Sequence, residues 1–536
     1  MKSRKIVLLS VFSALLLSEA WPVIGFSFLI FFAFVPLFFV EESIAESNAK
    51  SSAIKFFGYS YLTFFVWNIL TTWWIYNASL GGAIMAILAN ALLMALVFTA
   101  FHKVKKKTKT GFFSLICFWI AFEYLHLNWD LSWPWLTLGN VFSMNYKWVQ
   151  WYEFTGILGG SLWVLIINIA AFYFVKSIIS ASALKQKIRK ASILFSLIIV
   201  PIFISYIIYS LQTPVHKTGG IHIVIVQPNI DPYNEKFNGL SDEAQLQKLL
   251  KLADEKVDST TDYLIAPETA IASNIWENQL QSAQQILLLK QYLKKHPRLK
   301  IVIGASTTKA YVNGEKPSAT ARKFTQEDGY YDSYNTALQI DTGNLIQMYH
   351  KSKLVPGVEK IPFPLLFKPF ESFAINLGGT AGSLGVQDER TVFRSVDKRS
   401  IIAPVICYES IYGEFVSDYV SKGAQLIFII TNDGWWGDTP GYKQHLSYAS
   451  LRAIETRRNI ARSANTGTSA IINSRGDISL QTEWWKEAVI KTEIFPSNKI
   501  TFYVEYGDYL GKLAAVLTAL ILVFYFYLKI KKKETV

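Results

Sequence analysis

Cysteine is nearly absent from this sequence, which has only Cys117 and Cys407 among its 536 residues. Two cysteines so far apart, one of them inside an apolar segment, predict no disulfide framework. Histidine is also scarce: the seven residues show no metal-ligand spacing, and there is no glycine-rich phosphate loop of the Walker type. These absences argue against a disulfide-stabilised domain, a metal site and a nucleotide-binding loop, and no metal or organic cofactor is predicted.

Charged residues are few as well. They make up 17% of the sequence, whereas 51% is hydrophobic and 15% aromatic, a composition too apolar for a water-soluble chain of this length. The formal net charge of +13 would be compatible with nucleic-acid binding. However, the lysine runs lie beside apolar segments, where the positive-inside rule expects them. We therefore predict a membrane protein that does not bind nucleic acid.

Eight apolar segments are long enough, or nearly long enough, to cross a bilayer, although the first and fifth fall short of the usual roughly 20 residues. Between the seventh and eighth lie about 300 residues of ordinary globular composition, enough for one large domain. We expect seven transmembrane helices in residues 1–211, a soluble domain in residues 212–508, and an eighth helix with a basic tail in residues 509–536. The segments are residues 6–20, 24–40, 56–76, 82–101, 112–127, 159–175, 191–211 and 513–528.

Lysine and arginine are distributed unevenly among the loops that join these segments. They precede the first segment and follow the second, fourth, sixth and eighth, whereas residues 77–81 have none and residues 128–158 have only Lys147. The positive-inside rule then places both termini in the cytoplasm and the large domain outside. The first segment also resembles a signal peptide, and cleavage there would leave the remaining topology unchanged.

Short β-branched runs alternate with helical stretches in the soluble domain, which is typical of an α/β fold. The carboxyl ends of strands are where functional sites collect in such folds, so polar residues that follow a strand are candidates for a site. We expect strands at residues 221–226, 263–266, 301–304, 337–341, 401–406 and 426–431, and helices near residues 241–257, 274–295 and 445–459.

Two reactive side chains directly follow predicted strands. Glu268 ends the segment Leu-Ile-Ala-Pro-Glu, and Cys407 follows the strand at residues 401–406. A thiol needs to be deprotonated to be a good nucleophile, so acyl chemistry at Cys407 requires a carboxylate base and a nearby cation. Lys351 is the candidate cation and could also stabilise an oxyanion. Taken singly, Cys407 fits a small core residue, Glu268 a turn residue and Lys351 a surface charge.

Taken together, these residues resemble the carbon-nitrogen hydrolase, or nitrilase, superfamily. A glutamate after an apolar strand is followed by Tyr-x-Lys-x-x-Leu-Val-Pro-x-x-Glu at residues 349–359 and by Cys-Tyr-Glu at residues 407–409. Three further segments add to the likeness: Tyr-Asn-Thr-Ala at 334–337, Thr-Asn-Asp-Gly-Trp-Trp-Gly-Asp at 431–438, and residues 457–462 with Asn-Thr-Gly at 465–467.

Seven apolar segments before such a domain and one after it narrow the resemblance to the apolipoprotein N-acyltransferase family, as does Leu-Ser-Trp-Pro-Trp-Leu at residues 131–136. The resemblance implies an αββα sandwich on an eight-helix bundle in a bacterial inner membrane, with the sandwich on the periplasmic side. It also implies transfer of an acyl chain from a phospholipid, through a cysteine thioester, to the N-terminal amine of a diacylglyceryl-cysteine in lipoproteins.

The resemblance assigns roles to individual residues. Glu268 would be the general base, Lys351 the oxyanion-stabilising cation and Cys407 the nucleophile. Supporting carboxylates would be Glu359 and Glu409, and site-lining residues would be Tyr408 and Trp435.

Four features near these motifs bear on which residues line the substrate site. Lys353 and the pair at residues 357–358 replace the His and Phe-Gly common in the family, and Phe237 stands near a position often held by Trp. The apolar, proline-broken segment at residues 361–370 fits either a lipid-facing arm over the site or packing into the domain core.

Two other functions stay open on the sequence alone. A membrane-tethered amidase would use the same three residues with water as the acyl acceptor, although a tether needs one helix rather than eight. A transporter or binding module would act through the bundle, and the intact set of Glu268, Lys351 and Cys407 argues against it.

Overall fold

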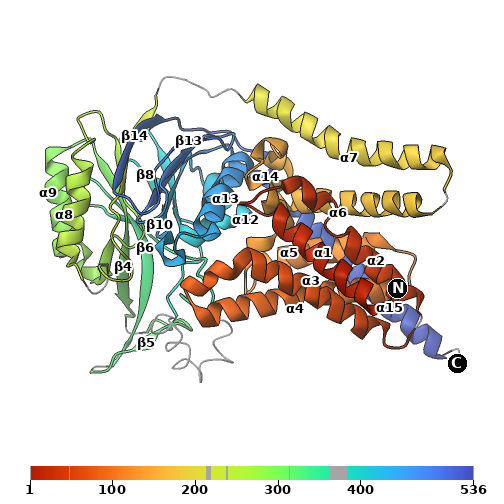
Figure 1. Ribbon diagram of the computed structural model, residues 1–536. Coiled ribbons are helices and arrows are strands. Elements are labelled where there is room, and N and C mark those ends of the chain that lie inside the picture. The colour runs from red at the N-terminus through yellow and green to blue at the C-terminus, as the bar shows by residue number, and fades with distance from the viewer. Residues whose placement is uncertain are drawn as a thin grey trace. The chain divides into compact units, whose positions relative to one another are not determined.

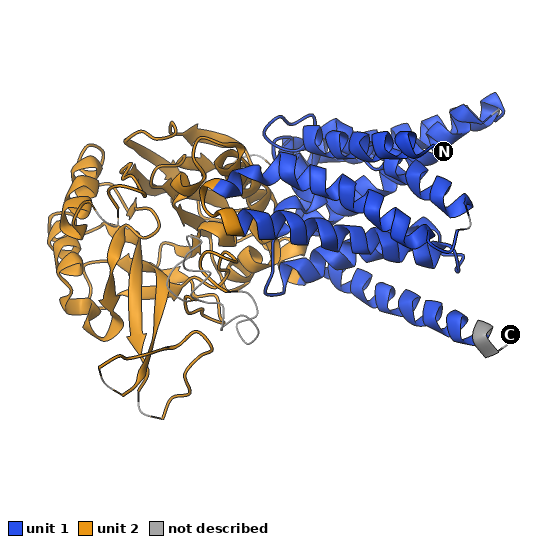
Figure 2. Ribbon diagram, turned by 60° about the horizontal axis from the view of Figure 1, so that its bottom comes forward, with its two compact units in different colours: residues 1–76, 82–211, 506–536 blue, residues 77–81, 212–505 orange. Residues whose placement is uncertain are grey.

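The computed structural model describes residues 2–47, 49–180, 182–212, 219–236, 239–312, 314–326, 328–361 and 383–534. The chain forms two compact units, one of residues 1–76, 82–211 and 506–536 and one of residues 77–81 and 212–505 (Figure 2). Phe237 and nearly all of the predicted arm at residues 361–370 lie outside the described residues.

The first unit is built from apolar helices (Figure 1), and each of the eight apolar segments contributes one long helix. Five spans among the described residues are long and apolar enough to cross a membrane: residues 27–46, 80–105, 152–179, 184–211 and 509–531. The long helices are α1 (Ser3–Ala20), α2 (Val35–Glu46), α3 (Ser52–Thr72), α4 (Leu80–Lys105), α5 (Phe112–Leu127), α6 (Tyr152–Ile179), α7 (Leu184–Leu211) and α15 (Tyr509–Glu534).

We expected eight membrane-spanning helices, but only five of the described helical spans are long and apolar enough to meet the criteria. Helix α5 has 16 residues, which is short for a bilayer. Helix α1 carries Arg4, Lys5 and Glu19 among its 18 residues, and polar residues such as Thr63 and Asn68 interrupt the apolar sequence of α3. The length and sequence of these three helices alone therefore do not mark them as membrane spans.

The second apolar segment is interrupted rather than continuous. A short 3-10 helix, η1 (Ser27–Phe31), ends before α2 begins, and Pro36 lies in the first turn of α2, where a missing N–H is tolerated. Asn168 of α6 satisfies the backbone at this break. Its side-chain oxygen accepts the N–H of Phe34 at 2.8 Å, and its amide donates to the carbonyl of Ile30 at 2.8 Å. Backbone groups in a lipid environment need such internal partners.

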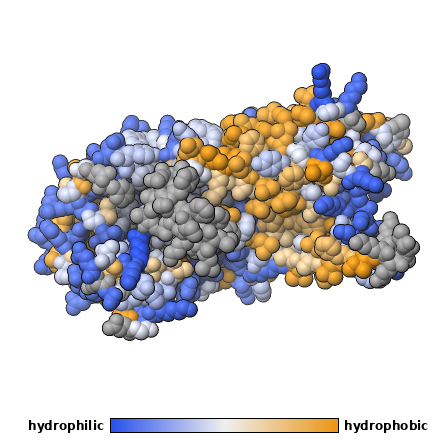
Figure 3. Space-filling model, turned by 90° about the horizontal axis from the view of Figure 1, so that it is seen from below, coloured by the Kyte–Doolittle hydropathy of each residue, from blue (hydrophilic) through white to orange (hydrophobic). Residues whose placement is uncertain are grey.

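Aromatic side chains form the core of the helical unit. The Phe98 ring on α4 has its centroid 5.6 Å from that of Phe34, 5.1 Å from Phe64 on α3 and 5.5 Å from Trp119 on α5. Pairs of this kind contribute roughly 0.5–1.5 kcal/mol beyond the area they bury. Apolar side chains also cover much of the outer surface of this unit (Figure 3). An extensive apolar exterior is what a lipid environment selects.

The described residues of the second unit form two β-sheets. One has the strand order β14-β1-β2-β4-β6-β5, with β3 beside β4 and β7 beside β6, and the other has the order β13-β12-β11-β10-β9-β8. Strands β1, β2 and β4 are parallel, as are β9, β10 and β11. The strands are β1 (Ile221–Gln227), β2 (Tyr263–Ile265), β3 (Ile271–Trp276), β4 (Lys300–Ala310), β5 (Arg322–Lys323), β6 (Tyr330–Ile340), β7 (Gln347–His350), β8 (Phe393–Arg394), β9 (Ile401–Ile406), β10 (Leu426–Thr431), β11 (Asn459–Ala464), β12 (Ala470–Ile472), β13 (Ile478–Gln481) and β14 (Ala488–Ile494).

Helices cover the outer faces of both sheets (Figure 1). Helices α8 (Asp242–Ala253) and α9 (Gln284–Lys295) pack on the first sheet through buried leucines such as Leu249 and Leu289, each of which contributes roughly 1.5–3 kcal/mol by burial. Helices α12 (Gly413–Ser421) and α13 (Pro440–Thr456) pack on the second sheet. Between the sheets, the rings of Tyr263 and Phe428 lie 5.3 Å apart. The second unit is therefore the αββα sandwich expected from the sequence.

The local predictions hold for all six strands and fail for one helix. Residues 274–295 do not form a continuous helix, because β3 extends to Trp276, the 3-10 helix η6 spans Glu277–Ser282, and α9 begins only at Gln284. Strand β3 pairs with β4, and the Trp276 ring stacks on Phe324 with centroids 5.9 Å apart. This pairing overrides the helical pattern of the segment.

The helix expected near residues 445–459 begins earlier and ends sooner. The Thr439 hydroxyl accepts the N–H of Gly441 and Pro440 opens the first turn, so α13 begins at Pro440. It ends at Thr456 because Arg457 adopts a φ of 51°, in the left-handed region.

Candidate active site

The carboxyl ends of the parallel strands bring several polar side chains together. Glu268 follows β2, Cys407 directly follows β9, and Asn432 and Asp433 follow β10. Lys351 directly follows β7, whose neighbour β6 contributes Asn335 from within the strand. The position of each side chain is thus set by the end, or by the register, of a buried strand.

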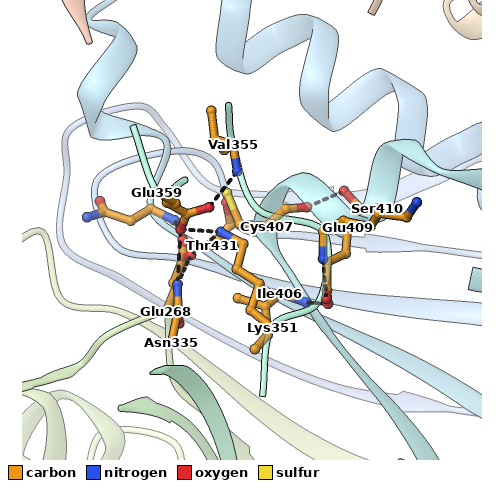
Figure 4. A network of polar contacts seen from close by, with 12 residues as sticks. Glu268, Asn335, Lys351, Val355, Glu359, Ile406, Cys407, Glu409, Ser410 and Thr431 are labelled. Atoms are coloured by element: carbon orange, nitrogen blue, oxygen red, sulfur yellow. Dashed lines mark hydrogen bonds and ion pairs between the residues drawn. The ribbon is translucent and has the colours of Figure 1, made fainter. Parts of the chain in front are cut away.

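The Lys351 ammonium lies between two carboxylates (Figure 4). Its Nζ donates to Glu268 Oε1 at 3.0 Å and to Glu359 Oε1 at 2.7 Å. Glu268 also accepts the Asn335 side-chain amide at 2.7 Å and the backbone N–H of Asn432 at 3.0 Å. Lys351 is 1% exposed and Glu268 is 6% exposed. Five residues from four separate segments of the sequence therefore form one largely buried network.

Burial and charge act in opposite directions on this network. Burial would raise the pKa of Glu268, but the Lys351 ammonium and the hydrogen bonds from Lys351 and Asn335 hold that pKa below its ordinary value. Burial would likewise lower the pKa of Lys351, but the carboxylates of Glu268 and Glu359 hold it well above its ordinary value. Both groups are therefore ionised near neutral pH, as a base and a stabilising cation need to be.

Cys407 lies beside this network in a strained backbone conformation. Its φ is 49°, a left-handed value that costs a non-glycine residue on the order of 1–3 kcal/mol. In Figure 4 the sulfur points toward Lys351 and Glu359. Burial and the Glu268 charge raise the pKa of the thiol, and the Lys351 charge lowers it only partly. The thiol is therefore protonated at rest and would have to lose its proton to act as a nucleophile.

A second polar network holds the Cys407 backbone. The Cys407 carbonyl accepts the Ser410 hydroxyl at 2.7 Å and His445 Nε2 at 3.1 Å. His445 Nδ1 lies 3.1 Å from Asp433 Oδ1, and Arg462 pairs with Asp433 at 2.5 Å. These groups are buried. The hydrogen bonds to the carbonyl offset part of the cost of the positive φ.

Glu409 connects the turn that carries Cys407 to the segment that carries Lys351. One carboxylate oxygen accepts the N–H of Ile406 at 2.8 Å, and the other accepts the N–H of Ser352 and the hydroxyl of Tyr349, each at 2.7 Å. Glu409 is fully buried, and burial raises the pKa of its carboxyl group. Its contacts make it a structural link between the two segments.

The two predicted site-lining residues differ in exposure. Tyr408 is 1% exposed, and its ring lies 5.4 Å from that of Tyr412. Trp435 is half-buried, and its ring lies 5.3 Å from that of Tyr233, whose hydroxyl donates to the Trp435 carbonyl at 2.9 Å. Trp435 is therefore the more accessible of the two.

Two of the residues that depart from the family motif, Gly357 and Lys353, have local contacts in the structure. Gly357 has a φ of 81°, and its N–H donates to the Lys360 carbonyl at 2.8 Å, so it forms a tight turn that favours glycine. The Lys353 ammonium lies 4.9 Å from the centre of the Tyr412 ring, within cation–π range.

Several residues of the site received no role from the sequence. Asn335, Asp433 and Arg462 lie in quoted motifs, and their signal is a polar side chain within or directly after an apolar run. His445 and Lys236 lie in no such motif, so only the fold identifies them. Among the residues that the structure describes, no group of three His, Cys, Asp or Glu side chains could hold a metal ion.

Comparisons with known proteins cover both units. The carbon-nitrogen hydrolase family model matches residues 223–498, and the model of the apolipoprotein N-acyltransferase N-terminal domain matches residues 13–170. The apolipoprotein N-acyltransferase of Chlorobaculum tepidum is 28% identical over 497 residues, covering 91% of this chain and 90% of that protein. The apolipoprotein N-acyltransferase of Geobacter metallireducens is 26% identical over 520 residues, covering 94% of this chain and 92% of that protein.

Solved structures give a more distant likeness, which covers about half of the chain. An amidase from Nesterenkonia aligns with a TM-score of 0.36 at 15% identity, covering 56% of this chain and 99% of the amidase. A nitrilase-superfamily protein from Saccharomyces cerevisiae aligns with a TM-score of 0.36 at 16% identity, covering 51% of this chain and 90% of that protein. The family models and the full-length relatives lead to one conclusion: the chain belongs to the carbon-nitrogen hydrolase family and, within it, to the apolipoprotein N-acyltransferases.

Proposed function

We propose that this chain transfers a fatty acyl group from a phospholipid, through a thioester on Cys407, to the N-terminal amine of a diacylglyceryl-cysteine in lipoproteins. The observation that carries the proposal is the buried network of Glu268, Lys351 and Glu359 beside a strained cysteine. This network supplies a base, a cation and a nucleophile at the carboxyl ends of adjacent strands, which acyl transfer requires.

In the first half-reaction Glu268 takes the thiol proton while the Cys407 sulfur attacks the ester carbonyl of the phospholipid. Negative charge then develops on the carbonyl oxygen, and the Lys351 ammonium and the backbone N–H of Tyr408 stabilise it. When the carbon–oxygen bond breaks, the proton on Glu268 passes to the departing lysophospholipid. The acyl chain remains on sulfur as a thioester, and Glu268 is ionised again.

In the second half-reaction the neutral amine of the lipoprotein attacks the thioester. Glu268 takes a proton from the attacking nitrogen, and the oxyanion is held by the same groups. The carbon–sulfur bond then breaks, the proton returns to the Cys407 sulfur, and the amide product leaves. The two steps share one covalent intermediate, so the kinetics are ping-pong.

The apolar segments and the lysine-rich loops support a location in a bacterial inner membrane. We infer eight membrane-crossing helices, both termini in the cytoplasm, and the domain of residues 212–508 on the periplasmic side. Five spans among the described residues meet the length and hydropathy criteria on their own, and the remaining three would cross within the bundle. Membrane residence suits the substrates, since both carry acyl chains that prefer the bilayer.

The test of this function is a transfer assay with purified protein, a phospholipid of defined acyl chain and a synthetic diacylated lipopeptide. We expect the lipopeptide to gain the mass of one acyl chain at its amine, with release of lysophospholipid in equal amount. Release of free fatty acid, or of ammonia from amide substrates, without any lipopeptide acylation would contradict the proposal and would favour a membrane-tethered amidase.

A further inference from the structure

Lys236 is a second lysine buried against the proposed catalytic residues. It is 2% exposed, and its Nζ donates to the backbone carbonyl of Glu268 at 3.0 Å. The ammonium also interacts electrostatically with the Glu268 carboxylate and with the Cys407 sulfur. Lysine is almost never fully buried unless its charge is compensated, so this position calls for an electrostatic explanation.

Hydrogen bonds fix both backbone polar groups of Lys236. Its N–H donates to the Asp231 carbonyl at 2.9 Å, and its own carbonyl accepts the Gln245 side-chain amide at 2.7 Å. Gln245 is 1% exposed on the inner face of α8, which otherwise presents leucines to the core. A buried glutamine costs stability unless it is hydrogen-bonded. Here its amide fixes the backbone of Lys236.

The charges of Glu268, Glu359 and Lys351 balance only when Lys236 is counted. Glu268 and Glu359 carry two negative charges and share the single positive charge of Lys351. Lys236 supplies the second positive charge.

The charged groups that surround these four residues have partners of their own. Asp433 pairs with Arg462. The Glu409 carboxylate accepts hydrogen bonds from Ile406, Ser352 and Tyr349 and interacts with the ammonium groups of both Lys353 and Lys351. These groups therefore do not substitute for the charge of Lys236.

We propose that Lys236 is a positioning residue of the acyl-transfer site, which holds the Glu268 carbonyl and keeps the buried site electrically neutral during the reaction. The inference rests on the proposed function. At rest the two lysines balance Glu268 and Glu359. When the thiol proton moves to Glu268, the negative charge of that carboxylate is replaced by that of the oxyanion, and the sum stays zero. Without Lys236 the site would carry an uncompensated negative charge at every stage, which burial makes costly.

The protonation of Lys236 makes this role dependent on pH. Burial lowers the pKa of Lys236 to about 8, although the Glu268 and Cys407 charges raise it. The positive charge is thus present below this pH and is lost as the pH rises through it. The first half-reaction should therefore slow on the alkaline side, and Lys236→Arg should extend its alkaline limit because arginine stays charged.

The test measures the reactivity of Cys407 directly, without assuming any substrate. In a Cys117→Ala background, the rate of Cys407 alkylation by iodoacetamide is followed between pH 6 and 11. The protein is compared with Lys236→Met, which lacks charge and donor, with Lys236→Gln, which keeps a donor, and with Lys236→Arg. The matched control is Lys300→Met, since Lys300 is 5% exposed and pairs with Asp397 at the amino end of β4, away from the site.

We expect both neutral variants to slow the alkylation of Cys407 roughly ten- to hundredfold near neutral pH, where Lys236 is charged, and to approach the rate of the unmodified protein above about pH 8, where Lys236 is neutral in both. Lys236→Arg should stay within about threefold of the unmodified protein near neutral pH, and Lys300→Met should leave the profile unchanged. An unchanged profile in a folded neutral variant, or an equal shift in Lys300→Met, would overturn the inference.

Two other outcomes of the experiment are possible. If neither neutral variant folds, the alkaline limb of acyl-enzyme formation in Lys236→Arg decides, and a limb identical to that of the unmodified protein overturns the inference. A Cys407 that is unreactive in the unmodified protein at every pH would instead contradict the proposed function, so the two failures are distinguishable.

Discussion

Asp433 gives the sharpest stability prediction, because its replacement by asparagine leaves a buried cation without a counter-ion. Asp433 and Arg462 are both fully buried, and their ion pair at 2.5 Å lies under the turn that carries Cys407. Breaking a buried pair by removing one partner costs about 3–5 kcal/mol. For a unit of about 300 residues, the unfolding entropy is roughly 0.6 kcal/mol per degree, so Asp433→Asn should lower Tm by about 5–8 °C.

The assay is thermal unfolding of the purified protein in detergent, followed by tryptophan fluorescence. The control is Asp438→Asn, since Asp438 is exposed and lies 3.6 Å from Lys443, and a surface pair of this kind should change Tm by at most about 1–2 °C. The double variant Asp433→Asn/Arg462→Met should lose less stability than the sum of the two single variants, because no lone charge stays buried. An Asp433→Asn protein that melts within 2 °C of the unmodified one would refute the reasoning.

The same pair predicts a dependence on pH. Arg462 and His445 hold the pKa of Asp433 well below its ordinary value, although burial would raise it. A carboxylate whose pKa is lower in the folded state than in the unfolded state stabilises the protein fully above its unfolded-state pKa, which is about 4. This stabilisation is lost as the pH falls from there through the folded-state pKa. The stability gap between the unmodified protein and Asp433→Asn should therefore stay constant from pH 5 to 8 and narrow below about pH 4.

Two further variants probe the proposed catalytic roles of Glu268 and Glu359. Glu268→Gln keeps the side-chain shape but cannot take the thiol proton, so single-turnover acyl-enzyme formation should slow by roughly 10²–10⁴-fold, and a loss below tenfold would contradict its role as base. Glu359→Gln retains an acceptor for the Val355 N–H, which Glu359 accepts at 2.8 Å, but removes one of the charges that raise the pKa of Lys351. In a Lys236→Arg background, where the residue at position 236 stays charged, the alkaline limb of the same reaction should then move to lower pH, and an unmoved limb would show that Glu359 does not act through Lys351.

The fold was predictable where burial leaves a pattern in the sequence. Strand β10, with six buried residues, reads as a continuous apolar run, which is typical of a parallel strand covered on both faces. Strand β3 has no such pattern, because only Ile271 and Ile275 are buried. Edge strands such as β5 and β8, of two residues each, are too short to give any signal. The break before α2 depends on Asn168, which is distant in sequence.

The site was predictable where motifs place reactive residues after strands. Glu268, Lys351 and Cys407 follow β2, β7 and β9, and the family pattern relates them to one another. The groups that tune them were not predictable. The contact between His445 and the Cys407 carbonyl, and that between Lys236 and the Glu268 carbonyl, use side chains that look like ordinary helix and turn residues until the chain is folded.

The central claim is that Cys407 carries the acyl group, and intact mass spectrometry tests it most directly. The unmodified protein and its Cys407→Ala variant are each incubated with phospholipid, then with a diacylated lipopeptide, and weighed before and after hydroxylamine. We expect an adduct of one acyl chain on the unmodified protein alone, labile to hydroxylamine as a thioester is, and discharged onto the peptide amine. An acyl adduct that persists on Cys407→Ala, or peptide acylation by that variant, would contradict the account.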